Sequence, residues 1–208
     1  MKVLILNGSP KSNGNTFTAL NIVCNELNKQ KIETEIIQIG NKNIRGCAAC
    51  GHCIKNQDRK CSIKDEVNDI IPKMIEADGI IISSPVYYSG VNGTMKSFLD
   101  RAFYVLGVNG SLMRHKVGAS VVAVRRSGGM TTFNELNHFL NYSEMVVVTS
   151  NYWNVAHGTA PGEVKEDAEG VQIMEVLGKN MAWMLNVLDK SNIEKPERVN
   201  KVFTNFIR

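Results

Sequence analysis

The hydrophobic positions of this 208-residue chain follow two alternating patterns. Short runs rich in valine and isoleucine are typical of strands buried on both faces of a sheet, and they occupy residues 3–6, 34–39, 79–83, 117–124 and 145–149. Between these runs, apolar residues recur at helical spacing over residues 17–27, 67–75, 95–103, 133–140 and 171–188. Strands that alternate with helices predict a parallel sheet with helices packed on both faces.

This α/β pattern favours a doubly wound, five-stranded sheet with the strand order 2-1-3-4-5. Residues 1–190 are expected to form this domain, and Asp65 is placed to cap the second helix. Residues 191–208 form a charged tail in which Val199, Val202, Phe203 and Phe206 recur at helical spacing. We expect the tail to be helical and to cover the body or a neighbouring subunit.

Residues 41–64, between the second strand and the second helix, interrupt the alternation. This segment has no apolar periodicity, and a loop of this length inside a compact domain is usually functional. It carries four of the five cysteines, Cys47, Cys50, Cys53 and Cys61. The fifth, Cys24, lies in an apolar helical stripe and is expected to pack in the core.

Four thiols within fifteen residues are enough to bind a metal centre without help from the rest of the fold. The two-residue spacings favour a [4Fe-4S] cluster. A zinc site made of the same four thiolates is the main alternative, and thiols without a metal are a third. His52 lies inside the motif and is interpreted as a neighbour of the site.

Composition and charge argue against several classes of protein. The formal net charge is only +4 and the Lys and Arg residues are scattered, so nothing indicates nucleic-acid binding. No apolar run approaches the roughly 18 residues of a membrane span, and the apolar start of the chain is too short for a signal peptide, so we expect a cytoplasmic protein. The four histidines are dispersed and no serine sits in a nucleophile elbow, which argues against hydrolysis.

The stretch "NGSPKSNGNT" joins the first strand to the first helix. Its backbone N–H groups, hydroxyls and amides, with Lys11 as the positive charge, suit a phosphate, because a helix N-terminus attracts anions. The stretch lacks the spacing of a nucleoside-triphosphate P-loop and contains no G-x-G-x-x-G. A single phosphate monoester fits best, and the alternative is an ordinary turn with Asn15 as the helix cap.

Two further loops should meet the same ligand, because a doubly wound sheet binds ligands where its winding reverses, at the carboxyl ends of strands 1 and 3. The loop after strand 3 contains Tyr87 and Tyr88, and an aromatic pair beside a phosphate site suits a flat heterocycle on a phosphorylated tail, such as flavin mononucleotide (FMN). The tyrosines could also be ordinary surface aromatics. The loop after strand 4 should approach the other edge of the ring, with Arg125, Ser127 and Gly128. The two arginines of this loop, Arg125 and Arg126, could stabilise negative charge on a reduced flavin, bind a pyridine-nucleotide phosphate, or be solvated.

Three segments, "NGSPKSNGNT", "SPVYYSGVNGTMKSFLDR" and "NYWNVAHGTAPGEVKEDAEG", resemble the NADPH-dependent FMN reductase family of flavodoxin-like proteins. The segment "GCAACGHC" with a later cysteine resembles the iron-sulfur flavoprotein branch of that family, which uses a compact cysteine motif. The resemblance implies that the FMN phosphate and ribityl chain contact Ser9, Lys11, Asn15, Thr16 and Phe17. It also implies that the isoalloxazine ring lies against Pro85, Val86, Tyr87 and Tyr88. Lys11 stands where the family often has arginine, which keeps the charge but weakens bidentate binding.

We therefore expect an oxidoreductase in which the flavin carries the chemistry. NAD(P)H would transfer a hydride to FMN, and electrons would pass to a small-molecule or protein acceptor, directly or through the cluster. The alternatives are a non-enzymatic electron carrier like flavodoxin, against which the mildly basic charge argues, and a zinc-stapled interaction module. A flavin at the end of a sheet leaves one ring face open, so we also expect a homo-oligomer, a dimer or a tetramer.

Overall fold

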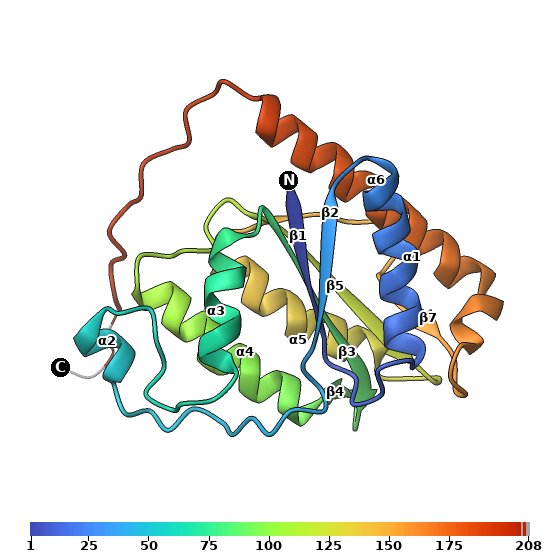
Figure 1. Ribbon diagram of the computed structural model, residues 1–208, viewed down its shortest axis with the longest axis horizontal. Helices are drawn as coiled ribbons and strands as arrows, with labels where there is room; N and C mark the ends of the chain where they lie inside the picture. The colour runs from blue at the N-terminus through green and yellow to red at the C-terminus, as the bar shows by residue number, and fades with distance from the viewer. Residues whose placement is uncertain (205, 207–208) are drawn as a thin grey trace.

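A seven-stranded sheet and its connecting helices make up the computed structural model, which describes residues 1–204 and 206 (Figure 1). The strands are β1 (Lys2–Asn7), β2 (Glu33–Gln38), β3 (Gly79–Tyr87), β4 (Gly90–Val91), β5 (Val117–Val124), β6 (Val146–Val147) and β7 (Val155–His157). The helices are α1 (Asn15–Lys29), α2 (His52–Asn56), α3 (Val67–Glu76), α4 (Gly93–Val108), α5 (Gly129–Tyr142), the 3-10 turn η1 (Glu163–Glu166) and α6 (Ala168–Lys190).

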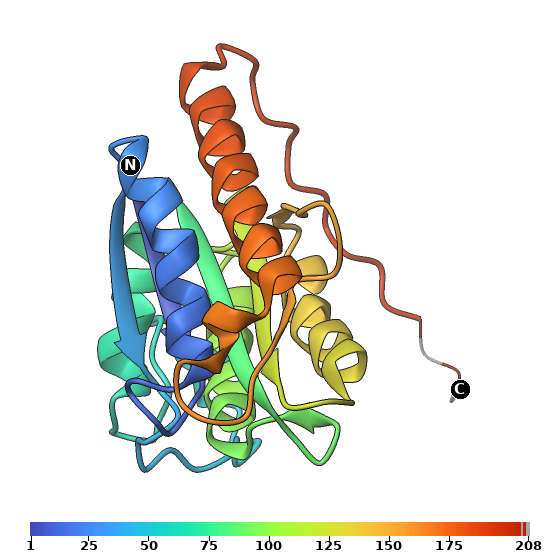
Figure 2. The same cartoon turned by 90° about the vertical axis from the view of Figure 1, so that its right-hand side faces the viewer.

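Helices cover both faces of the sheet, α1 and α6 on one face and α3, α4 and α5 on the other (Figure 2). Successive residues of a strand point to opposite faces. Leu4 and Leu6 of β1 therefore join the core beneath α3 and α4, while Val3 and Ile5 join the core beneath α1 and α6. Burial on both sides explains why the strands are continuous apolar runs in the sequence.

The main path of the sheet runs β2-β1-β3-β5-β6 with all neighbours parallel. This is the predicted order 2-1-3-4-5. The labels differ only because β4 is a short strand that pairs antiparallel with β3 and lies outside the main path, so β5 and β6 are the fourth and fifth strands of that path. The predicted flavodoxin-like topology is confirmed.

The fifth strand is interrupted, which the sequence pattern did not indicate. β6 pairs with the start of β5 at Val117 and Gly118, and β7 pairs with its end at Val122 to Val124, so the edge position is shared by two short strands. Asn154 fills the gap between them: its carbonyl accepts from Val122 N at 2.9 Å and its side-chain amide donates to Ser120 O at 3.0 Å. Of the strand expected at residues 145–149, only Val146 and Val147 therefore pair with the sheet.

Asp65 lies just before the second helix, and its Oδ1 accepts from Val67 N, the first N–H of α3, at 3.2 Å, as predicted for a capping side chain. The residue at the N-cap position of α3 is Glu66, and no capping side-chain bond is made there. The Asp65 carboxylate also forms an ion pair with Arg101 of α4, with an Nη1–Oδ2 distance of 2.6 Å. One carboxylate therefore contacts both the start of α3 and a charged partner from another helix.

The predicted helix in the tail is wrong for the residues that the structure describes. Residues 191–204 form no regular secondary structure, and Figure 2 shows the tail turning back after α6 and running down along the side of the body as an extended chain. It is held by Arg114, which donates to Pro196 O at 3.0 Å, and by Lys201, which donates to Tyr142 Oη at 2.9 Å. Phe203 stays 80% exposed, so the apolar stripe lacks the packing surface that a short helix needs. No helix in the described part of the chain is long and apolar enough to cross a membrane.

Candidate functional site

The carboxyl ends of β1, β3 and β5 lie at one edge of the sheet, the lower edge in Figure 1. Asn7, the last residue of β1, pairs with Ser83, and β3 continues past it to Tyr87. The loops that follow these strands are the three predicted to bind FMN. The fold therefore places them at a common edge, where doubly wound sheets bind their ligands.

The β1–α1 loop, residues 8–14, is held by backbone contacts and by side chains of the two strands β1 and β2, since Gln38 Nε2 also donates to Ser9 O. Gly8 N donates to Ser83 O at 3.1 Å, and Ser9 N donates to Asn7 Oδ1 at 3.1 Å. Gly40, just after β2, approaches so closely that a Cβ there would collide with the carbonyl oxygens of Gly8 and Ser9. The loop is thus held in one shape by both neighbouring strands.

The start of α1 is available to an anion. Asn15 is the first residue of the helix and Gly14 is its N-cap, with no side-chain bond to the first-turn N–H groups. Ser9 and Thr16 are buried beside this turn, Phe17 is half-buried and Lys11 is exposed. Uncapped N–H groups with a hydroxyl and a cation nearby suit a phosphate monoester.

Asn15 has a role that the sequence did not indicate. Its side-chain oxygen accepts from Gly162 N at 3.0 Å and from Val164 N at 3.3 Å, which ties the segment after β7 to the start of α1. A Cβ on Gly158 would lie 2.8 Å from Asn15 Nδ2, so glycine permits this close approach. Residues 158–164 are therefore a fourth loop at the same edge, within the segment "NYWNVAHGTAPGEVKEDAEG".

The loop after β3 is a tight hairpin. Tyr88 and Ser89 have φ values of 47° and 60°, as a two-residue hairpin turn with both central residues left-handed requires. Pro85 and Val86 are half-buried, Tyr87 is 46% exposed and Tyr88 is fully exposed. The aromatic pair thus projects into solvent at the edge where the ring was predicted to bind.

The loop after β5 packs against this hairpin. Thr131 Oγ1 donates to Ser89 O at 2.6 Å. Gly128 has a φ of 87°, and a Cβ there would lie 2.9 Å from Val86 Cγ1, so this position requires glycine for its conformation and for the contact. Arg125 and Ser127 are exposed. The second and third predicted loops therefore meet directly.

A cavity of about 400 Å³ lies between the β5–α5 loop, β7 and the start of α6, with Arg126, Trp153 and His157 among its lining residues. Asp167 caps α6 there, and His157 Nδ1 lies 3.4 Å from its Oδ2. Burial alone would raise the pKa of Asp167, but hydrogen bonds from Gly170 N and His157 N outweigh it and lower that pKa. The pKa of this carboxylate in the cavity wall is thus held below its usual value.

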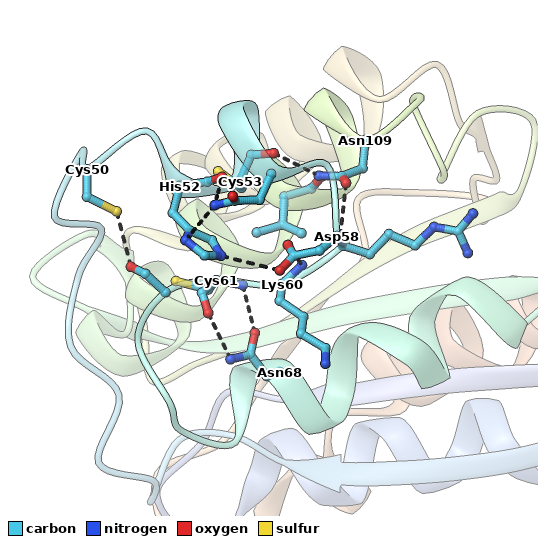
Figure 3. Close-up of polar contacts among 12 residues, drawn as sticks. Cys50, His52, Cys53, Asp58, Lys60, Cys61, Asn68 and Asn109 are labelled. Carbon is cyan, nitrogen blue, oxygen red and sulfur yellow. Dashed lines mark hydrogen bonds and ion pairs between the residues drawn. The ribbon is translucent and has the colours of Figure 1, made fainter.

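The cysteine loop, residues 41–64, lies against α3 and α4 at the side of the molecule shown in Figure 3. Asn68 of α3 accepts from Cys61 N at 2.8 Å and donates to Cys61 O at 3.0 Å. Asn109, at the end of α4, accepts from Arg59 N at 2.9 Å and donates to Cys53 O at 3.4 Å. The amide side chains of Asn68 and Asn109 thus form hydrogen bonds with the loop backbone at or near Cys61 and Cys53.

Arg101 of α4 donates hydrogen bonds to a sulfur atom and to backbone carbonyl groups of the same loop. Its side chain is fully buried, and Nε and Nη2 donate to Cys61 Sγ at 3.4 and 3.3 Å. Burial acts to lower the pKa of Arg101, but hydrogen bonds to Asp65 and Cys61 raise it overall. The sequence analysis missed Asn68, Arg101 and Asn109.

The sulfur atoms of Cys47, Cys50 and Cys61 each have a polar contact. Cys47 Sγ accepts from Ala49 N at 3.4 Å, Cys50 Sγ lies 3.1 Å from Ser62 Oγ, and Cys61 Sγ contacts Arg101. Burial raises the pKa of the Cys53 thiol, and negative charge on Cys61 and Cys47 adds to this rise. His52 contacts Asp58 and Asn56 within its own loop, as expected of a neighbour.

The donor set fits a tetrathiolate centre in number, type and location on one loop. The side chains are not arranged as one: among residues 1–204 and 206, no three His, Cys, Asp or Glu side chains are grouped to bind a metal ion. The expected convergence of Cys47, Cys50, Cys53 and Cys61 is therefore not found in the structure. Cys24 is buried in the core, as predicted.

Comparisons with known proteins agree with this geometry. The profile described as NADPH-dependent FMN reductase matches residues 1–160. An iron-sulfur flavoprotein of Methanocaldococcus jannaschii is 37% identical over 197 residues, covering 91% of this chain and 100% of the relative. An iron-sulfur flavoprotein of Methanosarcina thermophila is 30% identical over 199 residues, covering 92% of this chain and 98% of the relative. A solved flavodoxin from the domain Archaea has a TM-score of 0.59 at 15% identity, covering 89% of this chain and 99% of that chain, a likeness of fold alone.

The chain therefore belongs to the NADPH-dependent FMN reductase family, a family of flavin oxidoreductases. Within it, the chain is similar over most of its length to iron-sulfur flavoproteins. Both resemblances seen in the sequence motifs are confirmed.

Proposed function

We propose that the chain is an FMN-dependent oxidoreductase that takes electrons from NAD(P)H and passes them to a small-molecule or protein acceptor. The observation that carries the proposal is the meeting of the β1–α1 loop, the β3–β4 hairpin and the β5–α5 loop at one edge of the sheet. FMN, when bound, supplies the atom that accepts a hydride from the nicotinamide.

The protein's part is binding and orientation. The uncapped start of α1, with Ser9, Thr16 and Lys11, would hold the phosphate, and Phe17 would lie beside the ribityl chain. The ring would lie against the Pro85 to Tyr88 hairpin and the β5–α5 loop, which Gly128 allows to pack closely on each other. Arg125 is exposed at this edge, where its charge would favour a negatively charged reduced ring.

The phosphate assignment is tested by Thr16→Glu, which places a bulky carboxylate at the buried start of α1. We expect this variant to fold but to lose FMN, because the new charge repels the phosphate and fills its place. Asn25→Glu is the matched control, since Asn25 is exposed on the same helix away from its start. Flavin absorbance per folded chain is the measurement, and an undiminished FMN content in Thr16→Glu would contradict the assignment.

Steady-state oxidation of NADH and NADPH separates an enzyme from a flavodoxin-like carrier. An enzyme turns over many nicotinamides per flavin with an added acceptor, whereas a carrier does not oxidise nicotinamide catalytically. The mildly basic formal charge of +4 favours the enzyme. Absence of turnover with both nicotinamides would favour the carrier.

We also propose that Cys47, Cys50, Cys53 and Cys61 hold a [4Fe-4S] cluster. Their number, their two-residue spacings and the names of the similar proteins support this reading. Anaerobically prepared protein should contain about four irons per chain. Cys50→Ser should lose the iron and Cys24→Ser should retain it, while zinc in place of iron would support the alternative of a zinc-stapled module.

We further propose a homo-oligomer, a dimer or a tetramer. The tail presents Val199, Val202 and Phe203 to solvent, and Trp183 of α6 is 65% exposed, so apolar surface remains that a second copy could bury. Light scattering at micromolar concentration should report at least a dimer, and a monomer would count against this proposal.

A further inference from the structure

Arg101 is a buried cation in the middle of an otherwise apolar helix face. Its side chain is 0% exposed, and Phe98 and Val105 on the same face of α4 are core residues. A buried charge is destabilising unless it is paired and hydrogen-bonded, so this position requires a specific set of partners.

All the hydrogen bonds of the Arg101 guanidinium go to the cysteine loop and the residue that follows it. Nη1 and Nη2 donate to the two carboxylate oxygens of Asp65 at 2.6 and 2.8 Å, a bidentate pair. Nη1 also donates to Arg45 O at 3.2 Å and Nη2 to Ile63 O at 3.3 Å. Nε and Nη2 share the sulfur of Cys61. One side chain therefore joins both ends of the cysteine loop.

Among the four cysteines of the loop, Cys61 makes the most hydrogen bonds with α3 and α4. Asn68 binds its backbone N–H and carbonyl, and Arg101 binds its sulfur. Cys47 and Cys50, by contrast, are exposed and make contacts within the loop itself. Cys61 is thus fixed relative to the core, whereas the first two cysteines of the motif are not.

The helix that carries Arg101 begins at the proposed flavin site. Asn92, the N-cap of α4, accepts from Thr94 N and Met95 N, and its own N–H donates to Ser84 Oγ at 2.9 Å, next to Pro85. Arg101 lies eight residues after Gly93, which corresponds to about 12 Å along the helix axis. The contact with Cys61 therefore places this sulfur at a set position relative to the loop that would hold the flavin ring.

We propose that Arg101 is a positioning residue for the cysteine centre, which fixes Cys61 as the preset ligand and donates hydrogen bonds to its sulfur in the assembled protein. This inference rests on the proposed iron-sulfur function. Hydrogen bonds to a ligand sulfur stabilise the added electron of a reduced cluster, so Arg101 would raise the reduction potential of the centre. Lysine cannot replace Arg101 fully, because its single ammonium group lacks the several N–H groups with which the planar guanidinium contacts Asp65 and Cys61 at the same time.

The test compares Arg101→Lys and Arg101→Gln with the wild type in anaerobically purified, full-length protein. Lys96→Gln is the matched control, since Lys96 lies on the same helix in a half-exposed pair with Asp100. We expect Arg101→Gln to keep FMN but lose most of its iron. Arg101→Lys should retain more iron, with a reduction potential shifted to a more negative value. Wild-type iron content and an unchanged potential in both variants would overturn the proposal.

A second readout uses metal-free protein, with alkylation of each cysteine followed by mass spectrometry. Loss of the Arg101 contact should increase the alkylation rate of Cys61 at least tenfold while Cys47 changes little, since Cys47 does not contact Arg101. If the wild type contains FMN but no iron, the cluster proposal has failed. The change in the alkylation rate of Cys61 relative to that of Cys47 then decides whether Arg101 positions Cys61. An unchanged rate at Cys61 would overturn that role.

If the single variants fail to fold, the double variant Arg101→Met, Asp65→Leu removes both charges of the buried pair together, an exchange that proteins often tolerate. Its iron content and Cys61 alkylation rate should then show the same losses and gains as Arg101→Gln. Wild-type values for both quantities in a folded double variant would count against the proposal.

Discussion

The β1–α1 loop and the cysteine loop both follow a strand of the sheet, but different contacts hold them. The backbone of the β1–α1 loop bonds to the neighbouring strand at Ser83, and the chain at Gly40 packs directly on it. The cysteine loop has one short helix of its own and is held by the side chains of Asn68, Arg101 and Asn109.

This difference predicts opposite sensitivities. A loop shaped by close backbone packing should be disturbed by added atoms, because nothing beside it can move away without shifting a strand. A loop held by long-range side chains should be disturbed by removing those side chains. The FMN content and the state of the cysteine loop should therefore respond to different substitutions.

The largest effect is expected from Asp65→Ala, which leaves the guanidinium of Arg101 buried without its carboxylate. Breaking a buried pair in this way costs about 3–5 kcal/mol of unfolding free energy. Asp100→Ala is the control next to Arg101: its pair with Lys96 is half-exposed, and its loss should cost less than about 1 kcal/mol. Urea unfolding measures both, and equal costs would show that the buried pair does not hold the loop.

Gly40→Ala should act on the other loop. Its new Cβ would collide with Gly8 and Ser9, so the β1–α1 loop must shift, at a cost of about 1–3 kcal/mol. We expect FMN affinity to fall at least tenfold in a flavin titration, while iron content is unchanged. Gly46→Ala is the control in the cysteine loop, because the nearest atom to its Cβ would be 4.0 Å away. Equal FMN affinity in the two variants would contradict the backbone account.

Asn68→Ala removes the three hydrogen bonds that Asn68 makes with Cys61 and Ile63. At about 0.5–1.5 kcal/mol net for each bond, the expected cost is about 1.5–4.5 kcal/mol. Limited proteolysis should cut the cysteine loop faster, with FMN content preserved. Loss of FMN in parallel with faster cutting would show that the two loops are not held independently.

The smallest effect is expected from Gly107→Ala in α4, which touches neither loop. A Cβ there meets open space, and alanine is favoured over glycine within a helix by about 0.5–1 kcal/mol. Thermal unfolding should show a small gain in stability with unchanged FMN and iron. A loss of stability would mean that α4 is more constrained than its packing indicates.

The same difference explains what the sequence could predict. The strands and their order followed from continuous apolar runs, and the β1–α1 loop from its glycines and its place before a helix, because these signals are local. Arg101 and Asn109 act on residues 36 to 56 positions away in the sequence, so no spacing pattern pointed to them. One signal was present: Arg101 lies at helical spacing between Phe98 and Val105, a charge on a buried face.

Two other predictions failed for a similar reason. The fifth strand was predicted as one run. Asn154 instead binds the backbone of β5, and the edge position beside β5 is divided between the two short strands β6 and β7. The tail has the periodicity of a helix, but periodicity forms a helix only where a surface is available to pack against, and its apolar side chains are exposed in the described residues.

Quantification of FMN, iron and acid-labile sulfide per chain, in protein purified without oxygen and supplied with free FMN, tests the central claim most directly. The account predicts about one FMN, removed by Thr16→Glu, and about four irons, removed by Cys50→Ser but not by Cys24→Ser. A folded protein that retains no FMN under these conditions would contradict the claim that the sheet edge is a flavin site.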